Sequence, residues 1–182
     1  MNKLLLLSLL LLMALLPACK VKDPFPKPQP PASQLDLLPP ATQTGRRTFG
    51  CLLNGQAWNL AGSPFSGPLF TANYSGRHLS LVARGATVSS DRVTTGGIIQ
   101  IEIDNMGSPG KYIISGRTTE FVNYDNVTNK CSFYADAAYP ATVEITHFDP
   151  VARIVSGTFF FTLTTPGCGQ VAVTDGRFDS LF

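Results

Sequence analysis

The chain has 182 residues, of which 44% are hydrophobic and only 14% are charged, and its formal net charge is +2. The net charge comes from the residues before Arg46. From Arg46 onward, two Lys and eight Arg balance seven Asp and three Glu, so this part of the chain has no net charge. A balanced charge gives no bulk electrostatic attraction to a polyanion and excludes nucleic acid as the expected partner.

The N-terminus has the parts of a secretory signal peptide: Lys3 supplies a positive charge, and residues 4–16 are an apolar run that only Ser8 interrupts. The run is too short for a membrane-spanning helix, which needs roughly 20 apolar residues. The Leu-Pro-Ala-Cys sequence that ends at Cys19 resembles a bacterial lipobox, in which the Cys sulfur receives a diacylglycerol and the peptide is cut before it. We therefore predict a signal peptide over residues 1–18, lipidation of Cys19 and anchoring in the cell envelope. The outer membrane is the favoured membrane, with the folded domain in the periplasm or at the cell surface.

Residues 19–45 are predicted to be the lipidated Cys and an extended linker. This segment shows no apolar period, and seven prolines are crowded into it: Pro24, Pro26, Pro28, Pro30, Pro31, Pro39 and Pro40. Proline-rich chain favours the extended polyproline II conformation. We therefore expect a spacer between the lipid and a folded domain over residues 46–182.

The domain shows apolar residues at a period of two, with no stretch at helical spacing. The predicted strands are 48–53, 56–60, 69–74, 78–84, 99–103, 111–115, 118–124, 131–134, 142–148, 154–164 and 170–178. The clearest hairpin lies at Asn54-Gly55, because a type I′ turn needs positive φ at both central positions and these residues adopt it most easily.

About ten short strands joined by tight turns predict a single all-β domain, either an antiparallel β-sandwich or a barrel-like meander. The most apolar of these strands, 154–164, shows how the two faces separate. The residues expected in the core are Val155, Phe159, Phe161 and Leu163. Phe160 lies between two of them and is expected on the opposite face.

Three cysteines remain after Cys19, and an exported protein can form disulfides. An odd number leaves one thiol over. We favour a bridge between Cys131 and Cys168, with Cys51 as a buried apolar residue in a strand, although the sequence by itself leaves the other pairings open. The cysteines are far apart and only two histidines accompany them, so we predict no metal site and no cofactor.

Short segments spread over the domain carry a resemblance to a known family. They are Phe-Gly-Cys-Leu-Leu-Asn-Gly-Gln-Ala-Trp at 49–58, Pro-Gly-Lys-Tyr at 109–112, Ile-Thr-His-Phe-Asp at 145–149, Ser-Gly-Thr-Phe at 156–159 and Thr-Asp-Gly-Arg-Phe-Asp at 174–179. Together they resemble a group of uncharacterised lipoproteins of Gram-negative envelopes, filed as a domain of unknown function. The resemblance implies a lipoprotein with an all-β fold, and it brings no catalytic residues with it.

Two pairs of residues are candidates for catalysis. His147 lies near the end of the predicted strand 142–148 and Asp149 follows two residues later, so strand alternation would let them share a face, as a base and its orienting carboxylate would. No Gly-x-Ser-x-Gly motif accompanies them, so we interpret them as surface or structural residues. Glu102 and Asp104 also share a face, and paired carboxylates can act in acid–base catalysis. We interpret them instead as the solvent-facing side of an exposed strand.

An oxygen-rich stretch is a candidate calcium site. It contains Asn123, Asp125, Asn126 and Asn129. Calcium prefers such oxygen ligands, but the spacing matches no Asp-x-Asp-x-Asp-Gly loop. We favour a turn formed by hydrogen bonds between these side chains and the backbone.

Asp175, Arg177 and Asp179 alternate along the last predicted strand and are expected on one face. Arginine binds carboxylates through two parallel hydrogen bonds. We therefore expect Arg177 to hold a carboxylate there and to close that end of the domain.

These patterns predict a lipid-anchored module that is not an enzyme and that binds an envelope protein or a glycan. The alternative is a small envelope hydrolase with an unrecognised site, and a third possibility is a purely structural assembly partner. A glycan site would gather exposed aromatic residues on one platform, drawn from Trp58, Tyr74, Tyr112, Tyr124, Tyr134 and Tyr139. A hydrolase would instead place His147 or Glu102 in a concave pocket with a polar partner.

Overall fold

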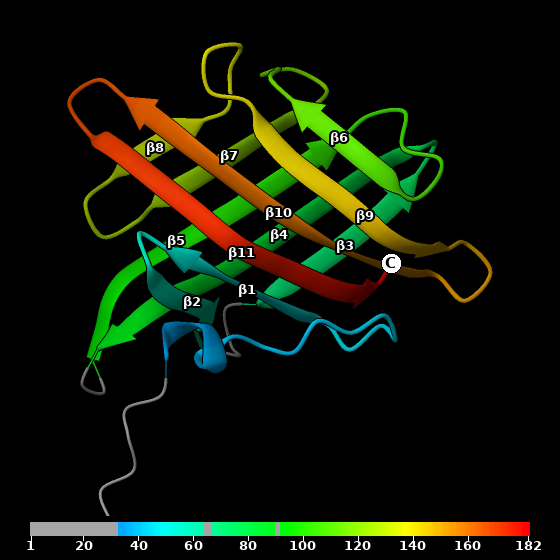
Figure 1. Ribbon diagram of the computed structural model, residues 1–182, viewed down its shortest axis with the longest axis horizontal. Helices are drawn as coiled ribbons and strands as arrows, with labels where there is room; N and C mark the ends of the chain where they lie inside the picture. The colour runs from blue at the N-terminus through cyan, green and yellow to red at the C-terminus, as the bar shows by residue number, and fades with distance from the viewer. Residues whose placement is uncertain (1–32, 64–66, 90–91) are drawn as a thin grey trace, which may run out of the picture. The chain divides into compact units, whose positions relative to one another are not determined.

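The computed structural model describes residues 33–63, 67–89 and 92–182, and the predicted signal peptide and Cys19 lie outside these ranges. Residues Ala32–Phe182 form one compact unit. Its described part contains a short 3₁₀ helix, η1 (Gln34–Leu37), no α-helix and eleven strands (Figure 1). The strands are β1 (Thr48–Leu53), β2 (Gln56–Leu60), β3 (Phe70–Ser75), β4 (His78–Ser89), β5 (Arg92–Ile103), β6 (Gly110–Ile114), β7 (Phe121–Asn126), β8 (Cys131–Tyr134), β9 (Ala141–Asp149), β10 (Ile154–Thr165) and β11 (Gly169–Leu181).

All eleven strands belong to one antiparallel sheet. Within the sheet, hydrogen-bonded strands follow the order β6-β9-β10-β11-β1-β2-β4-β5-β7-β8. Outside this order, β3 pairs with the first half of β4. The sheet curls strongly into a half-barrel (Figure 1). The all-β prediction is therefore confirmed, and of the two architectures that the sequence left open, the structure adopts the barrel-like one.

The concave face of the sheet carries the hydrophobic core, because side chains alternate between the two faces of every strand. In β10, Phe159 and Phe161 are each 2% exposed, whereas Phe160 between them is 54% exposed. Val155 and Leu163 are fully buried on the same side as the two core phenylalanines. The predicted assignment of these residues to two faces is confirmed.

Four glycines let aromatic rings lie directly against the backbone of the curled sheet. The pairs are Gly85 with Trp58, Gly97 with Tyr124, Gly157 with Phe178 and Gly176 with Phe159. A Cβ atom at any of these glycines would lie within 3.0 Å of both the facing ring and a backbone oxygen. Glycine in a strand permits this close approach, and the covering ring replaces the packing that the missing side chain would have supplied.

The hairpin turn predicted at Asn54-Gly55 is present, but one long hairpin was not predicted from the sequence. Asn54 and Gly55 have φ angles of 50° and 79°, which confirms the hairpin predicted between β1 and β2. The sequence missed the ladder between residues 85–89 of β4 and residues 92–98 of β5. This stretch is rich in Gly and Thr and poor in large apolar residues, so the period-two signal is weak there. Backbone pairing between β4 and β5 forms the ladder in this stretch.

The segment before β1 is part of the folded unit rather than of the linker to which the sequence assigned residues 33–45. The η1 helix begins at a capping box between Ser33 and Asp36. The Gln34 side chain accepts a hydrogen bond from the backbone N–H of Ala57 at 2.8 Å, and Leu38 is only 7% exposed. The described residues 33–45 therefore pack with the strands of the compact unit.

Asp179 in β11 holds the end of this segment. Its buried carboxylate accepts hydrogen bonds from the hydroxyls of Thr42 at 2.5 Å and Ser156 at 2.8 Å. The backbone N–H groups of residues 44–46 donate to the same carboxylate at 2.7–3.1 Å. Burial alone would raise the pKa of Asp179, but these hydrogen bonds lower it to about 2. The ionised carboxylate therefore joins the incoming chain to β10 and β11.

The two faces of β10 give the first prediction. Phe159→Ala should lower the free energy of unfolding by about 3–5 kcal/mol, because it removes a buried ring and leaves a cavity. Phe160→Ala is the matched control on the same strand, and it should change that free energy by less than about 1 kcal/mol because its ring is exposed. Urea unfolding measures both. Equal losses for the two variants would contradict a core on one face only.

The second prediction concerns acid stability. The folded-state pKa of Asp179 lies below its unfolded value, so this group stabilises the protein by about 2–3 kcal/mol above the unfolded pKa. That contribution is lost as the pH falls from about 4 towards 2. Asp179→Asn should remove this part of the pH dependence and destabilise the protein at pH 7. Asp175→Asn, at an exposed position of the same strand, should leave the profile unchanged, and a similar loss in both variants would refute the assignment.

Candidate functional site

One end of the half-barrel opens into a cavity of about 380 Å³, which we call the mouth pocket. Three turns, β1–β2, β7–β8 and β10–β11, converge there with the ends of β4 and β5, at the left of Figure 1. Its lining consists of Leu53, Asn54, Gln56, Thr87, Thr95, Tyr124, Asn126, Asn129, Phe133, Cys168, Gln170 and Val171. The open ends of curled sheets are common places for small-molecule sites.

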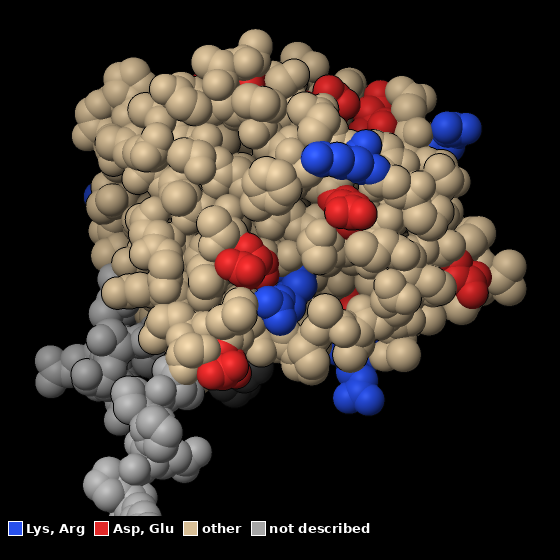
Figure 2. All heavy atoms as spheres, in the orientation of Figure 1, with Lys and Arg blue, Asp and Glu red and all other residues tan. Residues whose placement is uncertain are grey.

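The lining of the mouth pocket contains amide and hydroxyl groups and an apolar side, and it contains no charged side chain. The amides come from residues in the three turns or at the strand ends beside them, and the apolar side comes from the core residues Leu53, Phe133 and Val171. Elsewhere the described surface does carry charges, and Figure 2 shows one face on which both signs are interspersed. The pocket is therefore a neutral, hydrogen-bonding recess.

Three asparagines of the pocket are held by the backbone. The side-chain oxygen of Asn54 accepts from the N–H of Ala172 at 2.8 Å, and that of Asn129 accepts from Cys131 at 3.2 Å. The side-chain oxygen of Asn126 accepts from Thr128 at 3.0 Å and from Asn129 at 3.2 Å. A backbone N–H can bond only to the amide oxygen, so the NH₂ group of each asparagine is left to donate elsewhere.

Tyr124 is a buried residue of the pocket lining that carries a hydroxyl group. Its residue is 1% exposed, and its hydroxyl has no hydrogen-bond partner among the described residues. Burial, with a smaller effect from Cys51, raises the pKa of Tyr124 to about 12, so the hydroxyl stays neutral and can both donate and accept. Leaving such a group unsatisfied costs about 1–3 kcal/mol. A ligand that supplied the partner would recover that energy.

The disulfide predicted between Cys131 and Cys168 is confirmed, and it crosses the rim of the mouth pocket. It joins the start of β8 to the β10–β11 turn, and the Thr165 hydroxyl donates to the backbone oxygen of Ser132 beside it. Cys51 is buried as a free thiol, as predicted, and burial raises its pKa far above the ordinary range. The rim is therefore held by a covalent bond.

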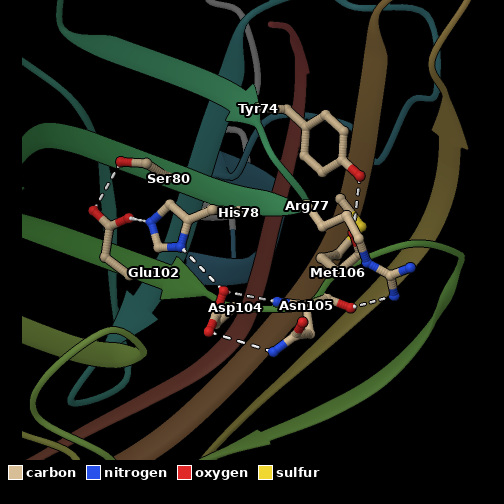
Figure 3. A network of polar contacts seen from close by, with 8 residues as sticks. All are labelled: Tyr74, Arg77, His78, Ser80, Glu102, Asp104, Asn105 and Met106. Carbon is tan, nitrogen blue, oxygen red and sulfur yellow. Dashed lines mark hydrogen bonds and ion pairs between the residues drawn. The ribbon is translucent and has the colours of Figure 1, made fainter.

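The opposite end of the half-barrel is filled by aromatic rings. Tyr74 contacts Phe148 and Phe182 with ring centroids 4.9 and 5.3 Å apart, and the two phenylalanines stack on each other at 5.8 Å. The Tyr74 hydroxyl donates to the backbone oxygen of Met106 at 2.8 Å (Figure 3). Here, in contrast to Tyr124, the hydroxyl of a half-buried tyrosine is satisfied by the protein itself.

Glu102 is not the solvent-facing residue that the sequence predicted. It is 6% exposed on the outer face of β5, where it accepts hydrogen bonds from Ser80 at 2.7 Å and Gln100 at 2.8 Å. The His78 Nε2 atom lies 2.8 Å from its second oxygen, and His78 Nδ1 lies 3.9 Å from Asp104 (Figure 3). Ser80 and His78 come from β4 and cover the carboxylate together with Gln100 of β5, and the sequence pattern of β5 by itself does not reveal the contacts from β4.

This network does not have the geometry of a serine hydrolase. A serine nucleophile is activated when its hydroxyl donates to a histidine, which a carboxylate in turn orients. Here the Ser80 hydroxyl donates to Glu102, and the His78 ring bonds to the same carboxylate instead of to the serine (Figure 3). The arrangement links β4 to β5 and leaves no activated nucleophile.

Asp149 has a structural role in the turn that follows β9. The Asp149 carboxylate accepts hydrogen bonds from the backbone N–H groups of Val151 and Ala152, both at 2.8 Å. These bonds lower the pKa of Asp149 and fix the turn between β9 and β10. The carboxylate is therefore occupied by the turn.

The oxygen-rich stretch at the end of β7 forms the turn that we favoured over calcium binding. Asn126 and Asn129 bond to the backbone of the β7–β8 turn, while the Asn123 amide donates to the Asp125 carboxylate at 3.0 Å. Among the described residues, no group of three or more His, Cys, Asp or Glu side chains is placed to hold a metal ion. The sequence missed that two of these asparagines also line the mouth pocket.

The predicted pairing of Arg177 with a carboxylate is wrong. Its guanidinium donates to the backbone oxygens of Asp175 at 3.3 Å and Pro39 at 3.4 Å. Asp175 has a φ of 53°, and the pairing of β10 with β11 shifts register nearby, so the simple alternation is broken. Asp179 meets hydroxyl and backbone donors instead.

The six candidate aromatic residues do not form one exposed platform. Trp58 and Tyr124 are buried in the core, and Tyr74 and Tyr112 are half-buried. Tyr134 and Tyr139 are exposed, and the Arg117 guanidinium lies 5.5 Å above the Tyr134 ring. Tyr124 is the member of this set that lines the mouth pocket, where it presents a hydroxyl.

A larger cleft of about 620 Å³ lies beside β3. Arg47, Arg153 and the last residues of β11 contribute to its lining. None of its lining residues carries a buried side-chain polar atom that lacks a partner within the described part of the chain. The mouth pocket is therefore the better candidate, because its unsatisfied hydroxyl points to a ligand.

Comparison of the chain with protein-family models, with curated proteins and with solved structures found no match. The resemblance to envelope lipoproteins therefore stays a prediction from the sequence. Within the described residues, no helix is long and apolar enough to span a membrane.

The third prediction tests whether the Tyr124 hydroxyl is unsatisfied in the protein alone. Tyr124→Phe should leave the free energy of unfolding unchanged or raise it, because it removes a buried group without a partner and keeps the ring. Tyr74→Phe is the matched control and should cost about 1 kcal/mol, because it removes the hydrogen bond to Met106. Chemical denaturation of both variants provides the measurement. A clear loss of stability in Tyr124→Phe would show that the hydroxyl already has a partner.

Proposed function

We propose that this protein is an exported, lipid-tethered domain of the cell envelope that binds a ligand in the mouth pocket without transforming it. The observation that carries the proposal is a neutral pocket with a buried Tyr124 hydroxyl that lacks a partner among the described residues. The signal peptide and Cys19 support the tether. The disulfide indicates an oxidising, extracytoplasmic location.

Binding fits the chemistry of the pocket better than catalysis does. General acid–base catalysis needs a group whose pKa lies near the working pH, and a nucleophile needs an adjacent base. The lining contains no carboxylate, histidine or lysine, and Cys168 is tied in the disulfide. With a pKa of about 12, Tyr124 remains protonated and is a poor base. The pocket thus supplies hydrogen bonds and apolar contact, which are the means of recognition.

The tether places the domain beside the other components of the envelope. Two or three acyl chains on Cys19 would hold it there, because each buried methylene contributes about 0.8 kcal/mol. The partner would then be an envelope protein or a glycan, with no cofactor needed. A small hydrolase is the weaker alternative, because the polar cluster around Glu102 lacks the serine–histidine pair.

The fourth prediction tests the tether. Cells that express the full chain and are fed labelled palmitate should label the wild-type protein, and Cys19→Ser should abolish the label and release the protein from the membrane fraction. Cys51→Ala is the control, because this buried thiol cannot be an acylation site in the folded domain and the variant should remain labelled. Undiminished labelling of Cys19→Ser would refute the lipid anchor.

A further inference from the structure

We infer that the mouth pocket binds a neutral saccharide, the hydroxyl-rich end of a glycan, through amide groups and the Tyr124 hydroxyl. The inference rests on the proposed function, because it names the class of ligand for the same pocket. It begins from the kind of hydrogen-bonding groups that the pocket presents. A sugar hydroxyl both donates and accepts, so it is matched by side chains that can do both.

The pocket offers such groups from several directions. Gln56 and Gln170 are exposed at the rim and present both a carbonyl oxygen and an NH₂ group. Asn54, Asn126 and Asn129 present NH₂ groups whose direction is fixed, because their oxygens are already bonded to the backbone. Tyr124 belongs to the same lining, and its buried hydroxyl lacks a partner within the described structure. A ring of sugar hydroxyls would satisfy all of these groups at once.

The absence of charge in the lining selects a neutral ligand. A carboxylate, phosphate or ammonium group that entered the pocket would lose its hydration and meet no charge of opposite sign. The apolar side formed by Leu53, Phe133 and Val171 suits the C–H face of a sugar ring. The volume of about 380 Å³ lies in the range of small-ligand sites and fits a short saccharide.

The rim is organised before any ligand arrives. The disulfide at Cys168 and the backbone bonds to the three asparagines restrict the turns that carry the polar groups. A site that is already ordered loses less conformational entropy on binding, which raises affinity. Reduction of the disulfide should therefore weaken the saccharide complex even where the domain stays folded.

The test uses the full chain in a detergent whose headgroup is not a sugar. Isothermal titration calorimetry and saturation-transfer NMR are run with maltotriose, cellotriose, mannotriose and the trimer of N-acetylglucosamine. Trigalacturonate serves as the charged saccharide, and an N-acetylated, C-amidated trialanine serves as a neutral peptide. The expected result is saturable binding of at least one neutral saccharide and no binding of the other two probes.

Variants locate the binding in the pocket. Tyr124→Phe should weaken the saccharide complex about fivefold, the effect of one lost hydrogen bond, without loss of stability. Gln170→Ala should weaken it by a similar factor. Gln43→Ala is the matched control, because Gln43 is an exposed glutamine that does not line the pocket, and it should bind as the wild type does.

Three results would overturn the inference: no neutral saccharide binds, only the peptide or the charged saccharide binds, or Tyr124→Phe and Gln170→Ala bind the saccharide as tightly as the wild type. These failures are distinct from failure of the proposed function. Peptide binding that is lost in Gln170→Ala would keep the pocket as a binding site and reject the saccharide. Saccharide binding that neither variant weakens would reject the pocket itself. The tether is judged separately by the labelling of Cys19.

Discussion

The described part of this protein is one sheet with no second layer to cover it, and that constraint shapes the rest of the molecule. A sheet with one apolar face must bury that face against something, and no α-helix or second sheet is present among the described residues. The only remaining partner is the sheet itself, so it curls into a half-barrel around its own side chains. On the concave side, aromatic rings lie directly against glycine backbone, as Trp58 does at Gly85 and Phe159 does at Gly176.

Curling a sheet creates two ends, and the two ends of this half-barrel are finished differently. At one end Tyr74, Phe148 and Phe182 pack together, and the tyrosine hydroxyl bonds to the backbone of Met106. At the other end the turns carry amides, a disulfide crosses the rim, and the Tyr124 hydroxyl is left without a partner in the described structure. The two ends each contain a tyrosine, but among the described residues the protein supplies a hydrogen-bond partner only to the hydroxyl of Tyr74.

A buried polar group needs a hydrogen-bond partner, and this rule explains the surroundings of the two buried carboxylates in this fold. Asp179 is fully buried, and five donors from the incoming chain and β10 surround it. Glu102 is almost as buried on the outer face, and three side chains from β4 and β5 cover it. In both places the carboxylate joins segments that are distant in sequence, so each acts as a structural link. The Tyr124 hydroxyl is one of several buried side-chain polar atoms that lack a partner within the described residues, and it belongs to a residue that lines the mouth pocket.

The sequence by itself determined the features that depend on neighbouring residues. The turn at Asn54-Gly55 follows from backbone sterics, and the two faces of β10 follow from alternation around Phe160, whereas the signal peptide and the lipidation of Cys19 stay predictions. The disulfide was favoured but remained one of several pairings. What only the tertiary structure decided are contacts across the sheet: the burial of Glu102 beside His78, the hydrogen bonds from residues 42–46 to Asp179, and the meeting of three turns at the mouth pocket. A period of two tells which face a side chain takes, but the curl of the sheet decides which distant strands that face will meet.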